Sequence, residues 1–269
     1  MSCPDLYYET HGSAGPHVLL VHGIYSARSH WYPNLDGLTA FARPVIVELY
    51  GHAHSPTPDD QACYHPDRYV AQFERIREAV GAERWFTVGQ SLGAALTLRY
   101  GLAHPERVIA QVFTNSGSAF ASPEVRRNMA DGRAAQQRRI DEGTLPDPRE
   151  SPLNPSRNRR LTPQFRHALE QDTALHSPLG IARTSMYTTP DVSLYGRGAE
   201  NSVPTLMCVG VREERFAENR RYIEAHWARL EVVALNGGHG VNMDVPADFN
   251  AAVRGFFERF IDAAEATGG

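Results

Sequence analysis

Short apolar runs rich in β-branched residues recur along the chain, with helix-like segments between them. Strands that alternate with helices are typical of a mostly parallel sheet that is covered by helices on both faces, and we therefore predict an α/β fold. The predicted strands are His17–Val21, Pro44–Leu49, Trp85–Val88, Val108–Thr114, Thr205–Val209 and Glu231–Leu235. The predicted helices are Pro66–Val80, Leu92–Ala103, Asn219–Trp227 and Pro246–Ile261.

This alternation stops between about Ala119 and Arg197. The segment is helix-like and rich in arginine up to Ile140, and prolines then interrupt it. A structureless connection of this length is unusual inside one domain, and Thr162–Gln171 carries a helix start signal. We predict an inserted helical cap at residues 119–197, with residues 1–118 and 198–269 forming the core.

The amino-acid composition narrows the range of possible partners and enzyme classes. The 269 residues are 42% hydrophobic, which suits one large core, and the net charge of −4 gives no reason to expect nucleic acid or an anionic membrane as partner. We expect a small-molecule substrate, and the sequence leaves open whether the protein forms a homodimer. Every basic residue is arginine, and the absence of lysine excludes Schiff-base chemistry, pyridoxal phosphate anchoring and a Walker-type phosphate loop. No cofactor is expected.

The three cysteines are Cys3, Cys63 and Cys208. Their number is odd and their spacing is neither CxxC nor that of a metal finger, so we expect no disulfide framework and no metal site. A reducing cytoplasm fits this pattern best. The N-terminus lacks a basic segment followed by an apolar run, and no stretch approaches the ~18 apolar residues of a membrane span.

The sequence Gly89-Gln90-Ser91-Leu92-Gly93 lies between a predicted strand and a predicted helix. A tight turn in this context exposes the serine Oγ, and small neighbours avoid collisions. The pattern alone would arise by chance in roughly one such chain in ten. Its position predicts that Ser91 is a nucleophile rather than an ordinary serine in a glycine-rich turn.

A serine hydroxyl needs a base, and His239 is the best candidate among twelve histidines. It lies in a glycine-rich loop directly after the last predicted strand, where the loops of a parallel sheet converge. The other histidines considered fit structural roles better: His104 beside Pro105 fits a helix terminus, and the rest lie in an early polar loop, namely His52, His54 and His65.

The base in turn needs a carboxylate that orients its ring. Glu213 and Glu214 follow the strand that precedes His239, and spacing alone does not separate them. The end of the Val108–Thr114 strand is followed by Asn115-Ser116-Gly117-Ser118 and offers no carboxylate there.

An oxyanion forms when a serine attacks a carbonyl, and two backbone N–H groups usually stabilise it. One should belong to Leu92, the residue after the nucleophile. The second should come from the turn after His17–Val21, and the amide of Ile24 is the best candidate.

Together these motifs resemble the α/β-hydrolase superfamily. Val18–Gly23 is similar to the family's strand and oxyanion loop, and Glu48–Ser55 resembles its D-x-P-G-H-G-x-S loop with three changes. In the family the acid usually falls three residues after the glycine that ends its strand, here Gly210. The resemblance therefore favours Glu213 over Glu214.

Within the superfamily, the residues from Gly210 to Phe216 and the arginine-rich stretch after Thr114 resemble succinyl-hydroxycyclohexadiene-carboxylate synthases. Those enzymes usually have an arginine soon after the elbow glycines, whereas this chain has Ala94 and Ala95. We therefore prefer a hydrolase to a lyase. The resemblance implies that a serine, not the aspartate of haloalkane dehalogenases and many epoxide hydrolases, is the nucleophile.

The predicted activity is cleavage of an ester, thioester or lactone through an acyl-enzyme on Ser91. Two alternatives stay open: a carbon–carbon bond hydrolase or lyase with the same residues, and a non-catalytic ligand receptor on the same fold. Candidate substrate contacts, at least half of which fit packing roles better, are Tyr25, Trp31, Gln90, Phe120, Met186 and Tyr187.

Overall fold

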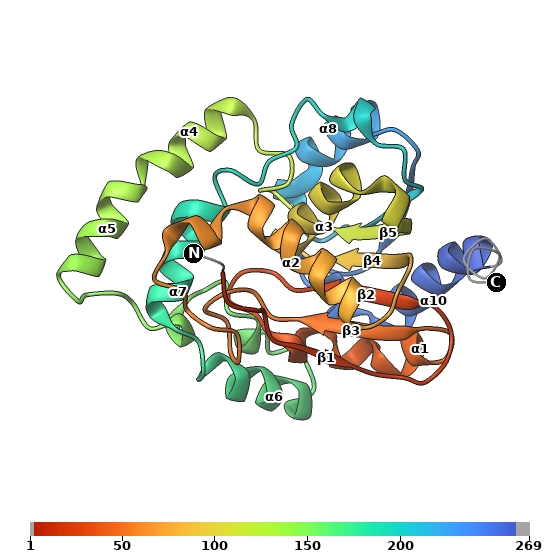
Figure 1. The fold of residues 1–269 in the computed structure, drawn as a ribbon, viewed down its shortest axis with the longest axis horizontal. Coiled ribbons are helices and arrows are strands. Elements are labelled where there is room, and N and C mark those ends of the chain that lie inside the picture. Colours follow the sequence, from red (N-terminus) through yellow and green to blue (C-terminus); the bar gives the residue numbers. More distant parts are fainter. Residues whose placement is uncertain (1–2, 262–269) are drawn as a thin grey trace.

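The computed structural model describes residues 3–261, and a seven-stranded sheet lies at its centre (Figure 1). The strand order is β1-β3-β2-β4-β5-β6-β7; β1 runs antiparallel to β3 and every other pairing is parallel. The strands are β1 (Tyr8–Thr10), β2 (His17–Val21), β3 (Arg43–Val47), β4 (Trp85–Gly89), β5 (Val108–Thr114), β6 (Thr205–Gly210) and β7 (Leu230–Leu235). The predicted α/β fold and all six predicted strands are confirmed.

The sequence analysis missed β1. This strand has three residues, Tyr-Glu-Thr, none of them fully buried, and it pairs only with β3 at the edge of the sheet. A run this short and polar lacks the apolar signal that identifies a buried strand.

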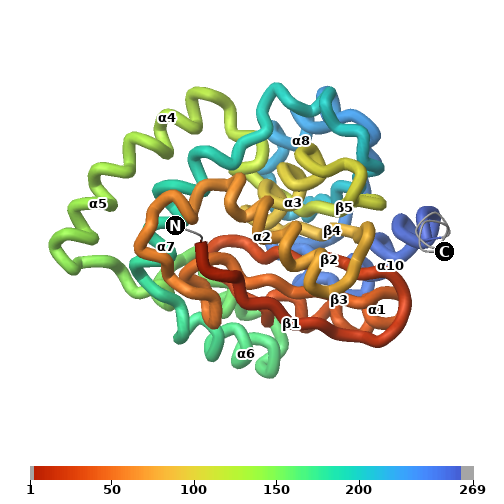
Figure 2. The backbone as a smooth tube through the Cα atoms, in the orientation of Figure 1, coloured from red at the N-terminus to blue at the C-terminus, as the bar shows by residue number. Residues whose placement is uncertain are grey.

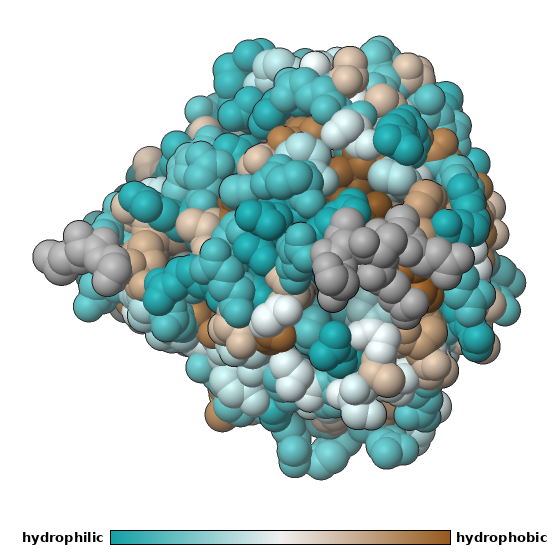
Figure 3. All heavy atoms as spheres, turned by 45° about the vertical axis from the view of Figure 1, so that its right-hand side comes forward, coloured by the Kyte–Doolittle hydropathy of each residue, from teal (hydrophilic) through white to brown (hydrophobic). Residues whose placement is uncertain are grey.

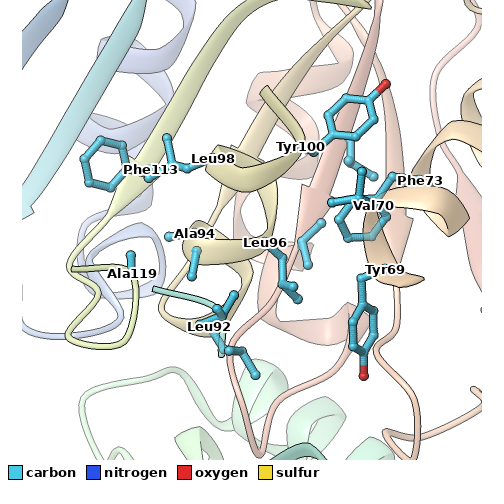
Figure 4. Close-up of a cluster of buried hydrophobic side chains, with 14 of the residues drawn as sticks. Tyr69, Val70, Phe73, Leu92, Ala94, Leu96, Leu98, Tyr100, Phe113 and Ala119 are labelled. Atoms are coloured by element: carbon cyan, nitrogen blue, oxygen red, sulfur yellow. The ribbon is translucent and has the colours of Figure 1, made fainter. Parts of the chain in front are cut away.

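Alternate residues of the strands point to opposite faces of the sheet, and each face carries its own core. Leu19 and Val21 pack with residues of α2, α3 and α8, whereas Val18 and Leu20 pack with residues of α1 and α10. Figure 4 shows part of the first core, where Tyr69 and Phe73 of α2 lie beside Leu96 and Tyr100 of α3. The helices are α1 (Leu35–Thr39), α2 (Pro66–Ala79), α3 (Leu92–Ala103), α8 (Ala217–His226) and α10 (Pro246–Phe257).

The inserted segment between β5 and β6 is helical over much of its length. Its helices are α4 (Pro123–Asp131), α5 (Arg133–Asp141), α6 (Pro163–Thr173) and α7 (Pro178–Arg183). The trace in Figure 2 shows α4 and α5 extending away from the sheet, while α6 and α7 lie nearer the core. Thr162 caps α6 by accepting a hydrogen bond from the amide of Phe165, which confirms the predicted start.

The prediction that the cysteines form no disulfide is wrong. Cys3 and Cys63 are joined, with their Cα atoms 5.6 Å apart, and Cys208 is buried as a free thiol. The carbonyl oxygen of Pro4 accepts hydrogen bonds from Tyr50 Oη (2.6 Å) and Gln72 Nε2 (3.2 Å), which hold the N-terminal segment in place beside Cys63. An odd number of cysteines without CxxC or metal-finger spacing does not exclude one disulfide between residues far apart in the sequence. The cysteines therefore no longer support a reducing compartment.

Among the helices of residues 3–261, none is long and apolar enough to cross a bilayer. The face in Figure 3 is largely hydrophilic, with hydrophobic residues scattered between polar ones.

Candidate active site

Ser91 lies at the turn from β4 into α3, half-buried, with a backbone φ of +53° and ψ of −116°. A non-glycine residue rarely adopts a positive φ, and such strain persists only where the surrounding structure imposes it. The glycines on either side are required by close packing. A Cβ on Gly89 would collide with α3 at Ala94, and one on Gly93 would collide with the Val21 carbonyl oxygen.

Glu213 and His239 are brought together although 26 residues separate them. His239 Nδ1 lies 3.0 Å from Glu213 Oε1 and 2.9 Å from Oε2. Glu213 follows the end of β6 and His239 follows β7, which is the adjacent parallel strand. Glu214, the alternative acid, is exposed and begins a short 3₁₀ helix, Glu214–Phe216.

Two further donors hold the Glu213 carboxylate. Asn115 Nδ2 donates to Oε2 at 2.8 Å and Arg215 Nε donates to Oε1 at 2.8 Å. Burial raises the pKa of Glu213, but the hydrogen bonds from His239, Asn115 and Arg215 outweigh it and lower the pKa to about 2. The Glu213 carboxylate is therefore ionised at neutral pH and can accept a hydrogen bond from the protonated Nδ1 of His239.

Asn115 is the functional candidate that the sequence analysis missed. It is fully buried after β5, and its side chain also exchanges hydrogen bonds with Gly210, donating to the carbonyl oxygen and accepting from the amide, each at 3.1 Å. Asn115 thus ties the end of β6 to the carboxylate that follows it. In the sequence, Asn115 is only a residue after a strand that lacks a carboxylate. Sequence spacing does not show which group its side-chain amide binds.

The histidine loop contacts the serine turn through Gln90, whose Nε2 donates to the His239 carbonyl oxygen at 3.2 Å. Within residues 3–261, no hydrogen bond joins Ser91 Oγ to the His239 ring. Such contacts are often long in ligand-free enzymes and tighten when substrate binds. The His239 side chain is 40% exposed and can therefore reach solvent or a bound substrate.

The two amides predicted for the oxyanion belong to Leu92, directly after Ser91, and to Ile24, directly after Gly23. In the described part of the chain, neither the Ile24 amide nor the Leu92 amide has a hydrogen-bond partner. Gly23 approaches the serine so closely that an added Cβ would lie 2.8 Å from Ser91 Cβ. Unpaired N–H groups beside a nucleophile can stabilise an oxyanion.

The predicted substrate contacts fall into two groups. Trp31 and Phe120 are buried within the two cores, where Trp31 packs on Phe249 and Phe120 packs on Trp227. Their place in these two hydrophobic cores favours a packing role for both. The remaining candidates lie near the turn of Ser91 or in the inserted segment, and a substrate contact there stays a prediction: Tyr25, Gln90, Met186 and Tyr187.

A second polar cluster lies apart from Ser91. Glu48, His54 and Asp172 present ligand atoms within 4.8 Å of one another, as a metal site would. However, Arg28 Nε lies 3.5 Å from Asp172 Oδ1 and 3.9 Å from Glu48 Oε1. The guanidinium group already supplies the positive charge, so the cluster is better described as an ion-pair network than as a cation site.

Comparisons with known proteins identify the fold family of the chain. The family model described as "alpha/beta hydrolase fold" matches residues 16–177. A putative 2-succinyl-6-hydroxy-2,4-cyclohexadiene-1-carboxylate synthase of Bacillus subtilis is 25% identical over 256 residues, which is 91% of each chain. The carboxylesterase YbfK of the same organism is 26% identical over 118 residues, covering 43% of this chain and 40% of that protein.

Solved structures extend the likeness to almost the whole chain. A hydrolase from Pseudomonas aeruginosa superposes with a TM-score of 0.74 at 24% identity, covering 94% of each chain. A parallel sheet with a strained serine between strand and helix, and a carboxylate–histidine pair beside it, is the arrangement of an α/β-fold hydrolase. The chain belongs to the α/β hydrolase fold family.

Proposed function

We propose that the protein is a serine hydrolase that cleaves a carboxylic ester, thioester or lactone of a small molecule through an acyl-enzyme on Ser91. The observation that carries this proposal is the Glu213–His239 pair, which lies beside the strained Ser91. Within residues 3–261 the amides of Ile24 and Leu92 have no hydrogen-bond partner and are available to an oxyanion. The serine, the base and the acid occur in the chain order expected for this fold.

In the proposed mechanism, His239 Nε2 takes the proton of Ser91 Oγ as the oxygen attacks the substrate carbonyl. The amides of Ile24 and Leu92 stabilise the oxyanion, and Glu213 stabilises the imidazolium. Collapse of the tetrahedral intermediate breaks the bond to the leaving group, which takes the proton from His239. A water molecule, deprotonated by the same ring, then releases the acid and restores Ser91.

The inserted segment would act as a cap over this site, with residues 1–118 and 198–269 as the hydrolase core. Its link to the core beside the site supports this role: Asn158 Nδ2 donates to Asp244 Oδ1 at 3.0 Å, and Asp244 Oδ2 accepts from the Gly238 amide at 2.7 Å. We propose that Tyr25, Met186 and Tyr187 contribute to the acyl pocket.

A carbon–carbon bond hydrolase or lyase is the second candidate. It is favoured by one observation, the similarity to the Bacillus subtilis synthase over 91% of the chain. Against it, Ala94 and Ala95 occupy the region where we expect such enzymes to carry an arginine that binds substrate carboxylates. In this alternative the same Ser91 and His239 would move protons without an acyl-enzyme.

A substrate panel separates the two candidates. We expect short-chain nitrophenyl esters and simple lactones to be hydrolysed, with an acyl adduct that can be trapped by rapid acid quench and detected by mass. Vinylogous diketones should be poor substrates. Preferential turnover of the diketones without any acyl adduct would contradict the esterase proposal and favour the second candidate.

Asn115 should act as a positioning residue for Glu213. Asn115→Ala removes a hydrogen bond to a charged group, which costs about 1.5–3 kcal/mol, so kcat/KM should fall about 10- to 100-fold. With one donor fewer, Glu213 holds the imidazolium more tightly, and the acidic limb of the kcat/KM profile should move to higher pH. The measurement is this profile for wild type and variant.

Asn201 offers a matched control, because it too is a buried asparagine with several partners: its Nδ2 donates to the carbonyl oxygens of Val203 (2.8 Å) and Ala228 (2.7 Å). Asn201→Ala should lower the free energy of unfolding but leave the pH profile in place. A profile that shifts equally in both variants, or in neither, would show that Asn115 has only a structural role.

A further inference from the structure

A cavity of about 470 Å³ opens in the inserted segment, between α6 and the loop that precedes it. This arginine cavity is lined by Arg149, Asn154, Ser156, Arg157, Arg159, Arg166, Glu170 and Thr173. We propose that it binds a small ligand with two or more anionic groups, phosphate or carboxylate. The proposal does not depend on the chemistry of Ser91, because none of the lining residues belongs to that site.

The charge of the lining is strongly positive. Four guanidinium groups face one carboxylate, that of Glu170, in a chain whose net charge is −4. Arg149 is already bonded to Asp147 through Nε, at 3.0 Å from Oδ1 and 2.8 Å from Oδ2. Bringing like charges together around one cavity is unfavourable unless counter-charge is present, so the lining favours an anion.

Three of these arginines are free to bind it. Across residues 3–261, the side chains of Arg157, Arg159 and Arg166 make no hydrogen bond and no ion pair. Some other arginines of the inserted segment are paired, such as Arg133, which donates to Asp191 Oδ2 at 2.9 Å, whereas Arg138 and Arg139 are exposed on α5 and do not line this cavity. Guanidinium groups bind phosphate and carboxylate oxygens through paired N–H donors, which sets the ligand class.

The floor of the cavity is polar and well anchored. Asn154, Ser156 and Thr173 are buried, and the amide of Ser156 donates to Asn154 Oδ1 at 3.0 Å. Within the described residues the Ser156 hydroxyl makes no hydrogen bond, so it can donate to an oxyanion. The volume falls in the range of about 300–1,000 Å³ that is usual for small-ligand sites.

Binding in this cavity should also affect the histidine loop. Asn158 lies between two of the arginines in sequence, and its hydrogen bond to Asp244 reaches the residue that holds the Gly238 amide. An anion that fixes Arg157 and Arg159 would therefore also hold Asn158 and its contact with Asp244. The ligand could be a separate effector or an anionic part of the substrate, and the experiment distinguishes them.

The test is isothermal titration calorimetry of the full chain with inorganic pyrophosphate and with citrate, at constant ionic strength. We expect one site with a Kd below about 1 mM for at least one probe. The double variant Arg157→Gln/Arg166→Gln should weaken binding at least about tenfold, or 1.4 kcal/mol. The matched control is Arg138→Gln/Arg139→Gln on α5, which removes the same charge from an exposed helix and should change Kd less than about twofold.

Absence of binding by both probes up to about 10 mM would overturn the proposal, as would an equal loss in the α5 control, which would indicate charge attraction without a site. Ester turnover adds the second arm. If the bound probe inhibits competitively, the cavity holds an anionic part of the substrate; if it changes kcat for a neutral ester, it holds an effector. Binding is measured without turnover, so failure of the proposed hydrolase activity would leave this result intact.

Discussion

Replacing Ser91 by alanine is expected to lower kcat for ester hydrolysis by about 10⁴-fold or more, with little change in KM. The acyl-enzyme route needs Oγ as the attacking atom, and no neighbouring group can replace it. The substrate contacts proposed for the inserted segment and for the amides of Ile24 and Leu92 would remain. The loss should therefore appear in kcat, as measured by steady-state kinetics with nitrophenyl acetate.

Ser118→Ala is a matched control. Ser118 is half-buried near the same strand ends, and within residues 3–261 its side chain makes only one long hydrogen bond, of 3.5 Å to the Ser116 hydroxyl. Its activity should stay within a few-fold of wild type. Residual activity of Ser91→Ala above about 10% of wild type would contradict the nucleophile assignment and favour direct attack by water that His239 activates.

The second large expected effect is unfolding in mild acid. Besides His17 at the start of β2, the side chains of four further histidines are buried: His22, His30, His52 and His176. The rings of His22 and His52 are 5.1 Å apart, and those of His52 and His176 are 5.2 Å apart. Burial lowers the pKa of His22 and His30 to about 3 and that of His176 to about 4, and it lowers the pKa of His52 as well.

These shifts fix the sign of the pH dependence. The folded protein keeps the four rings neutral, whereas the unfolded chain protonates them below its ordinary histidine pKa of about 6.5. Stability is therefore complete above that pH and falls as the pH drops, by up to about 5 kcal/mol per pH unit for the four together. Because domains are stable by about 5–15 kcal/mol, we expect cooperative unfolding near pH 5.

Urea denaturation at pH 7.0, 6.0 and 5.5 measures this dependence. His176→Asn should reduce the pH slope by about a quarter, because an amide oxygen can accept from the Ala53 amide, as His176 Nδ1 does at 2.9 Å, without titrating. His65→Asn replaces an exposed histidine and should keep the wild-type slope. An unchanged free energy of unfolding between pH 7 and 5.5 would show that the buried rings do not control acid stability.

The fold was predictable because its signal is local. Each buried strand is a short apolar run, and glycine spacing marks the turn at Ser91, so strand order along the chain and the position of the turn follow from periodicity and sterics. The strand β1 escaped prediction since three polar residues carry no such signal. The Cys3–Cys63 disulfide was missed because it depends on how the N-terminal segment crosses the molecule, which only the tertiary contacts of Pro4 determine.

The sequence predicted the main residues of the candidate site, but not the side chains that hold them in position. Parallel strands end at the same edge, so residues after β4, β6 and β7 must meet, and this places Ser91, Glu213 and His239 near one another. The roles of Asn115 and Gln90 depend on side-chain directions across strands, which sequence spacing does not encode. For the same reason, the sequence does not show whether Trp31 lines a substrate pocket or packs in the hydrophobic core. Its burial against Phe249 in the structure favours the core.

The most direct test of the central claim is intact mass spectrometry after treatment with a fluorophosphonate, which labels activated serines. We expect a single adduct on the wild-type chain, located by peptide mapping at Ser91, and none on Ser91→Ala. His239→Ala should label far more slowly because the base is missing. Labelling that persists undiminished in Ser91→Ala would contradict Ser91 as the nucleophile.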